Sequence, residues 1–225
     1  MSAARPVGLP TGIRAAIVDL DGTMIDTAPD FEVALNKMLV DLGLPPVHSA
    51  FVLHTIGKGS ENLIRRTLAE VGGPEALFPV ALASYQAHYL AINGEHATVY
   101  PGVVEGLQRL RDRGWSLACV TNKPNAFAGP LLRAKGLAAF FGPVYGGDSF
   151  ERKKPDPFPL LEACRALGSP PAQTLVLGDS SNDAQAARAA GCPVWLVRYG
   201  YNHGQPIETV DADGVLDRLD ELPLP

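Results

Sequence analysis

Two aspartates separated by one residue stand at the end of the first apolar run of the chain. Residues 15–20 are apolar except for Asp19, and Asp21 and Gly22 come directly after them. Side chains at positions i and i+2 of an extended segment project to the same side, so the two carboxylates can share one site. Gly22 permits a sharp turn immediately after the pair. Asp and Gly after a strand also form ordinary turns, so this pair indicates a site only together with other polar residues.

Such polar residues occur in three more places. Thr121 and Asn122 end a second apolar run, Asp179 and Asp183 follow another at residues 174–178, and Lys154 lies in a Pro-rich turn before a predicted helix. Two acids after a fully apolar strand can supply oxygen ligands to a hard cation. Each motif alone could also be a helix cap or a solvated loop. Their occurrence together, three of them at strand ends, indicates one site.

The elements that must position these residues are short strands alternating with helices. The near-continuous apolar runs are typical of strands in a parallel sheet that is covered on both faces. Apolar residues at helical spacing lie between these runs, and Gly114 and Gly168 follow two of the predicted helices as stop signals. This order predicts a doubly wound, Rossmann-like α/β sheet with its ligands at the carboxyl ends of the strands. The four runs are residues 15–20, 115–121, 174–178 and 194–199.

The segment between the first two runs has only helical periodicity. Apolar stripes at residues 31–42, 64–71 and 83–92 predict helices, and no convincing strand separates them. We therefore expect a core formed by residues 1–30 and 97–225 and an all-helical domain over residues 31–96. Only residues 1–12 and 221–225 are expected to be loose ends.

Composition excludes several classes of protein. The net charge of −5 gives no basic surface for nucleic acid, and no apolar run is long enough to span a bilayer. The N-terminus lacks the apolar region of a signal peptide. Cys119, Cys164 and Cys192 are too widely spaced for a zinc cluster or a disulfide framework, and we expect buried, reduced thiols. A cytoplasmic protein is expected.

The four motifs occur in the order found in the haloacid dehalogenase superfamily, which the chain resembles over nearly its whole length. They are residues 19–23, Thr121 with Asn122, Lys154, and Asp179 with Asp183. The helical segment lies where that superfamily places its C1-type cap. Residues 56–60, 100–103 and 199–202 resemble those of phosphoglycolate phosphatases. The resemblance implies hydrolysis of a small phosphorylated metabolite, such as 2-phosphoglycolate.

The resemblance also implies a role for each catalytic residue. Asp19 would attack phosphorus and form an aspartyl phosphate. Asp21 would protonate the leaving alcohol and then deprotonate the hydrolytic water. Thr121, Asn122 and Lys154 would bind the phosphoryl oxygens.

The metal expected from the resemblance is Mg²⁺. Its ligands would be the Asp19 carboxylate, the Asp21 backbone carbonyl and Asp179, with Thr23 and Asp183 in supporting positions, Asp183 either through water or as an orienting residue. Charge accounting also favours a metal, because several carboxylates around a dianionic phosphate repel one another and the substrate. The absence of His and Cys from the motifs fits Mg²⁺.

Substrate choice is expected to depend on the cap. Lys58 and Arg65 are the predicted cap residues for a substrate carboxylate, and His54 is a further candidate. Two alternatives remain: a sugar phosphomutase of the same superfamily, which keeps both aspartates, and a non-catalytic binding protein on the same fold. A dehalogenase would lack the second aspartate, so Asp21 favours phosphoryl chemistry.

Overall fold

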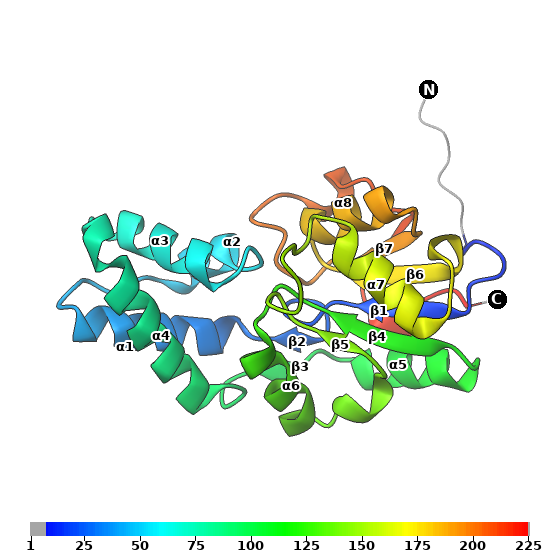
Figure 1. Ribbon diagram of the computed structural model, residues 1–225, viewed down its shortest axis with the longest axis horizontal. Coiled ribbons are helices and arrows are strands. Elements are labelled where there is room, and N and C mark those ends of the chain that lie inside the picture. Colours follow the sequence, from blue (N-terminus) through cyan, green and yellow to red (C-terminus); the bar gives the residue numbers. More distant parts are fainter. Residues whose placement is uncertain (1–7, 225) are drawn as a thin grey trace.

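The protein is built around one six-stranded parallel sheet. The computed structural model describes residues 8–224 (Figure 1). The strand order is β5-β4-β1-β6-β7-β8, so β1 lies between β4 and β6. This order confirms the predicted doubly wound α/β sheet. The strands are β1 Ala15–Val18, β4 Ser116–Val120, β5 Val144–Tyr145, β6 Thr174–Gly178, β7 Val194–Val197 and β8 Gly214–Leu216.

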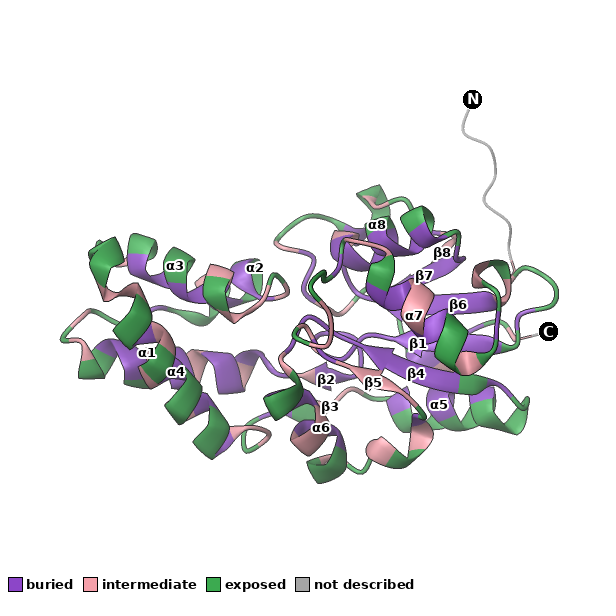
Figure 2. Ribbon diagram, viewed as in Figure 1, coloured by how far each residue is buried: buried purple, intermediate pink, exposed green. Residues whose placement is uncertain are grey.

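Helices cover both faces of this sheet. α5 (Val103–Asp112) and α6 (Asn125–Ala134) pack on the face that carries Ala16 and Val18 of β1. α7 (Phe158–Leu167) and α8 (Ser181–Ala190) pack on the opposite face, against Ile17. Neighbouring residues of β1 therefore enter different cores, which is why the strand is apolar at every position (Figure 2).

The chain leaves the sheet after β1 and returns before α5 through a short antiparallel pair. β2 (Ile25–Asp26) pairs with β3 (Thr98–Val99), and four helices lie between them in sequence. This helical insertion confirms the predicted one. The helices are α1 Ala28–Asp41, α2 Ser49–Thr55, α3 Ser60–Glu70 and α4 Phe78–Ile92. We call this unit the cap; in Figure 1 it extends away from the sheet, with α1 and α4 side by side.

The structure differs from the expected helices in two details. α2 is a fourth helix that the sequence pattern did not predict, because its seven residues are too few to show a period. α1 begins at Ala28, inside the range assigned to the core, since Pro29 suits the first helical turn, where its missing N–H is not needed. The domain division at residues 30 and 97 remains a prediction.

Two buried side chains fix the points where the chain enters and leaves the cap. The Tyr201 hydroxyl, on a core loop, accepts hydrogen bonds from the backbone N–H groups of Thr27 (2.8 Å) and Ala28 (3.0 Å). It therefore satisfies donors at the start of α1 that the Thr27 side chain does not cap. Asp30 accepts from the N–H groups of Gly94 (2.7 Å) and His96 (2.8 Å) in the return segment.

Short 3₁₀ helices complete the fold, and three expectations remain, on the chain ends, the thiols and membrane-spanning helices. Residues 8–224 also contain five short 3₁₀ helices, at Glu75–Leu77, Ala138–Phe140, Pro171–Gln173, Ile207–Thr209 and Leu219–Glu221. Of the predicted loose ends, residues 1–7 and residue 225 lie outside the described residues. The three cysteines are buried and free, as predicted. Within residues 8–224, no helix has the length and apolarity needed to cross a membrane.

Candidate active site

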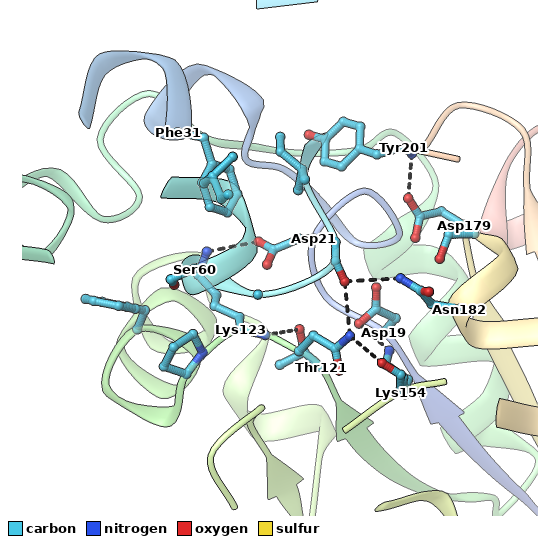
Figure 3. A pocket seen from close by; sticks show the side chains of 18 of the residues that line it. Asp19, Asp21, Phe31, Ser60, Thr121, Lys123, Lys154, Asp179, Asn182 and Tyr201 are labelled. Carbon is cyan, nitrogen blue, oxygen red and sulfur yellow. Dashed lines mark hydrogen bonds and ion pairs between the residues drawn. The ribbon is translucent and has the colours of Figure 1, made fainter. Parts of the chain in front are cut away.

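The polar motifs meet at the carboxyl edge of three adjacent strands. Asp19 follows β1, Thr121 follows β4 and Asp179 follows β6. Because β1 is the central strand of the three, the loops after it and its two neighbours converge on one point (Figure 3). The sheet thus brings together residues that are up to 160 positions apart in the sequence.

Three buried carboxylates form the centre of the site. Asp19, Asp179 and Asp183 each place an oxygen within 4.8 Å of the others. Burial, together with the nearby Asp183, raises the pKa of Asp19 to about 7, even though Lys154 opposes the shift. Burial and the charges of Asp183 and Asp19 also raise the pKa of Asp179 well above its usual value. Three carboxyl groups that are costly to ionise next to one another would be stabilised by a hard cation, which offsets their negative charges.

Lys154 neutralises part of this cluster. Its buried ammonium donates to Asp19 Oδ1 (2.7 Å), Asp183 Oδ1 (2.7 Å) and the Val120 carbonyl (2.8 Å), which uses all three of its protons. Burial alone would lower the pKa of Lys154, but the two aspartates raise it above its usual value. Lys154 is therefore charged and fixed against Asp19.

Hydrogen bonds from Ser180, Thr23 and Tyr201 hold the carboxylate cluster in place. Asp183 Oδ2 accepts from the side chain (2.7 Å) and backbone N–H (3.2 Å) of Ser180, which closes a capping box at the start of α8. Both oxygens of Asp183 thus have protein partners, which suits an orienting role. The Thr23 hydroxyl lies 3.3 Å from Asp179 Oδ1, and the Tyr201 N–H donates to the other oxygen at 2.5 Å.

Asp21 lies on the other side of the site and has a cationic partner that the sequence analysis did not identify. Its Oδ1 accepts from the Thr27 hydroxyl (2.8 Å) and from Lys123 Nζ (3.0 Å). The side chain of Lys123 is only 2% exposed. The available signal was a charged residue directly after Thr121 and Asn122, at the end of a buried strand.

The cap is held on the core by one of its carbonyl groups. The Gly57 oxygen accepts from Asn122 Nδ2 (3.0 Å), in the loop after β4, and from Asn182 Nδ2 (3.2 Å), in the first turn of α8. Gly57 has φ +105°, and a Cβ there would lie 3.1 Å from the His203 ring. Asn122 also donates to the Lys154 carbonyl at 2.9 Å. One predicted phosphate-binding residue therefore also contacts the cap.

Between the cap and the core lies a cavity of about 40 Å³. The core supplies a polar floor of aspartates and lysines together with Thr121 and Asn122. The cap supplies an apolar roof, and Figure 3 shows Phe31 above the polar groups. The apolar and aromatic side chains around the cavity are Phe31, Ile56, Leu63, Tyr85 and Tyr89 of the cap and Pro124, Phe127 and Tyr201 of the core.

The predicted cap cations lie elsewhere. Lys58 is exposed and does not line the cavity. Arg65 forms an ion pair with Glu75, and its guanidinium lies 3.7 Å from the centre of the Phe78 ring, on the outer face of α3. His54 lines a neighbouring hollow, beside Gly204. The lysine that lines the cavity next to the cap is Lys123, which belongs to the core and lies against Phe31 and Tyr89 of the cap.

The Gly57 contact can be tested by adding one methyl group. Gly57→Ala should lower kcat/KM of the reaction at this site by about 5- to 30-fold, because 1–2 kcal/mol of backbone strain and the close His203 ring disfavour the closed cap. Gly72→Ala is the matched control: Gly72 also lies in the cap with positive φ, but nothing lies within 4 Å of its Cβ position. Equal losses in the two variants would show that strain alone, and not the contact with the core, is responsible.

The fold and the site define an α/β protein whose reactive groups are carboxylates and lysines under a helical cap. A family model described as haloacid dehalogenase-like hydrolase matches residues 16–197, and the chain belongs to this family. It is 45% identical over 218 residues to a phosphoglycolate phosphatase of Thiobacillus denitrificans, with 96% of each chain covered. It is 46% identical to a plasmid-encoded phosphoglycolate phosphatase of Cupriavidus necator, over 93% of this chain and 91% of that one. The crystal structure of a predicted phosphoglycolate phosphatase from Haemophilus somnus superposes with a TM-score of 0.88 at 33% identity, covering 94% of this chain and 96% of that one.

Proposed function

We propose that the protein is a magnesium-dependent phosphoglycolate phosphatase that works through a phosphorylated Asp19. The observation that carries this proposal is the placement of Asp19 and Asp21 in one cavity with separate partners. Asp19 is held by Lys154 within the carboxylate cluster, whereas Asp21 is held by Thr27 and Lys123. Two carboxylates in different surroundings can perform different steps of one reaction. The relatives at 45–46% identity support the phosphatase activity and the substrate.

In the first step an Asp19 carboxylate oxygen attacks phosphorus, and the bond from phosphorus to the ester oxygen breaks. Asp21 gives its proton to the leaving alkoxide. In the second step Asp21 takes a proton from water, and this water attacks the phosphorus of the aspartyl phosphate. The bond from phosphorus to Asp19 then breaks, which releases inorganic phosphate and restores the Asp19 carboxylate, while Asp21 again carries the proton with which it began.

The surrounding residues bind and orient the phosphoryl group. Thr121, Asn122 and Lys154 line the cavity beside Asp19. Each would donate to a phosphoryl oxygen, Lys154 and Asn122 in exchange for one of their present acceptors. Asp19, Asp179 and the Asp21 carbonyl would hold Mg²⁺, and the bound ion would offset the negative charge that collects on the phosphoryl oxygens. Magnesium is favoured because every donor is oxygen.

The proposed substrate is a small metabolite. The cavity is small and is lined on its cap side by Phe31, Tyr85 and Tyr89, which favours a short leaving group over a long or branched one. 2-Phosphoglycolate has a two-carbon leaving group and a carboxylate, and it is the substrate in the names of the relatives. A cytoplasmic location is part of the proposal, since the three cysteines are free thiols.

The proposal is tested by measuring phosphate release from a panel of small phosphate esters with Mg²⁺. We expect the highest kcat/KM for 2-phosphoglycolate and no activity after chelation of the metal. Absence of turnover on every ester would support a non-catalytic protein. Transfer of the phosphoryl group to a second sugar rather than to water would identify a phosphomutase.

Asp21→Asn should separate the two chemical steps. With an aryl phosphate, whose leaving group needs little protonation, Asp19 can still be phosphorylated. Breakdown of the aspartyl phosphate lacks its base and should slow by about 10²- to 10⁴-fold. Rapid-quench kinetics should therefore show a burst of phenol followed by slow turnover. Equal slowing of both phases would mean that Asp21 only shapes the site.

A further inference from the structure

Lys123 is a core residue whose ammonium group is enclosed by the cap. Its Nζ lies 4.6 Å from the ring centres of both Phe31 of α1 and Tyr89 of α4, and it donates to the Tyr89 hydroxyl at 2.5 Å. Its remaining oxygen partner within residues 8–224 is Asp21, at 3.0 Å. Two of the three ammonium protons therefore have oxygen acceptors, while Lys123 lines the cavity. A buried ammonium with a donor to spare beside a cavity is suited to an anionic ligand.

The Tyr89 hydroxyl is a second donor in the same place. Its lone pair accepts from Lys123, which leaves its own proton without an acceptor among the described residues. Burial and the charge of Asp21 raise the pKa of Tyr89 well above its usual value, so the phenol keeps this proton. Lys123 and Tyr89 together thus offer two donors at the boundary between the polar floor and the apolar roof.

The position of Asp21 indicates which part of the substrate would meet these donors. Asp21 protonates the ester oxygen, and its Oδ1 lies 3.0 Å from Lys123 Nζ. In 2-phosphoglycolate a single CH₂ group separates the ester oxygen from the carboxylate. We propose that Lys123, assisted by the Tyr89 hydroxyl, binds this substrate carboxylate and sets the preference for carboxylate-bearing esters. The inference rests on the proposed function and adds to it the residues that select the leaving group.

Charge accounting supports this assignment. Lys154 already gives its three protons to Asp19, Asp183 and the Val120 carbonyl, so it has none to spare for a substrate carboxylate. Neither Lys58 nor Arg65 lines the cavity. Lys123 is thus the one lysine or arginine beside the cavity, within residues 8–224, that retains a donor for the substrate.

The test compares two esters that differ only in the proposed contact. Ethyl phosphate has the same P–O–C–C chain as 2-phosphoglycolate but a methyl group in place of the carboxylate. The measured quantity is the ratio of kcat/KM for 2-phosphoglycolate to kcat/KM for ethyl phosphate. Lys123→Met should lower this ratio by about 30-fold or more, because a buried carboxylate would lose its cation. Activity on ethyl phosphate should fall less, through the lost contact with Asp21.

Further variants make the outcome decisive. Tyr89→Phe should lower the ratio by about 2- to 10-fold, the effect of one hydrogen bond, and Lys123→Arg should restore part of the preference because it keeps the charge. Lys37→Met, on the exposed face of α1, should leave the ratio unchanged. A ratio unchanged in both Lys123→Met and Tyr89→Phe would overturn the inference and leave Lys123 as a partner of Asp21 only. If Lys123→Met does not fold, the ratio in Tyr89→Phe decides.

These results are separable from a failure of the proposed function. Wild-type protein that hydrolyses neither ester would contradict the phosphatase proposal itself. Wild-type protein that hydrolyses both esters equally well would leave the phosphatase intact and overturn the role of Lys123, since there would be no preference for the carboxylate.

Discussion

Asp19→Asn should lower kcat for 2-phosphoglycolate by at least about 10⁴-fold, because an amide cannot form the covalent intermediate. The fold should be unchanged. Asn has the same shape, and Lys154 keeps Asp183 and the Val120 carbonyl as partners. One of three mutually repelling carboxylates is also removed, so the melting temperature of the metal-free protein should stay the same or rise. Phosphate release and thermal melts are the two measurements.

The control for this change is Asp112→Asn. Asp112 is an exposed residue of α5 whose carboxylate accepts a hydrogen bond from Gln108, far from the strand ends that carry the site. Its replacement should leave kcat unchanged. Activity of Asp19→Asn above about 1% of wild type would remove Asp19 from the nucleophilic role, since loss of a covalent nucleophile costs far more than 10²-fold.

Mg²⁺ should raise the thermal stability of the wild-type protein substantially. In the metal-free protein Asp19, Asp179 and Asp183 repel one another inside the fold. A metal that binds only the native state stabilises it by about 2.7 kcal/mol at a hundredfold excess over Kd. For a domain of this size the expected rise in Tm is ~5–10 °C. Differential scanning calorimetry with and without Mg²⁺ measures it.

Asp179→Asn identifies the source of that effect. Removing one carboxylate should raise the Tm of the metal-free protein slightly and abolish most of the magnesium response. Asp112→Asn should keep the full response. A wild-type protein whose Tm does not respond to magnesium, or an undiminished response in Asp179→Asn, would contradict the proposed metal site.

The sequence predicted the parts of the fold that have strong local signals. The long buried strands β1, β4, β6 and β7 appear as apolar runs because both of their faces are covered. β2, β3 and β5 contain two residues each and β8 contains three, which is too short for any pattern. Their positions depend on partners that are distant in the sequence.

The same distinction applies to the site. Asp19 and Asp179 could be proposed because they directly follow strands, and parallel strands bring their carboxyl ends together. Asp21 could be proposed from its spacing of two residues from Asp19. Lys123 could not be proposed in this way, because its burial depends on Phe31 and Tyr89. Helix packing in the cap places these two side chains over Lys123. Lys58 was proposed from its charge alone, and charge does not reveal the direction of a side chain.

The antiparallel pairing of β2 with β3 affects how the chain can fold. The next strand of the sheet after β1 along the chain is β4, and their pairing joins Val18 to Cys119 across about a hundred residues. The helices between β2 and β3 contact mainly one another, and even the most distant of these contacts, between α1 and α4, spans about half the separation of β1 and β4. Once they assemble, Asp26 and Thr98 lie side by side, and the loop that β1 and β4 must close shortens to a few tens of residues. This lowers the entropic cost of closure by about 1 kcal/mol, so early assembly of the cap helices should speed formation of the central sheet.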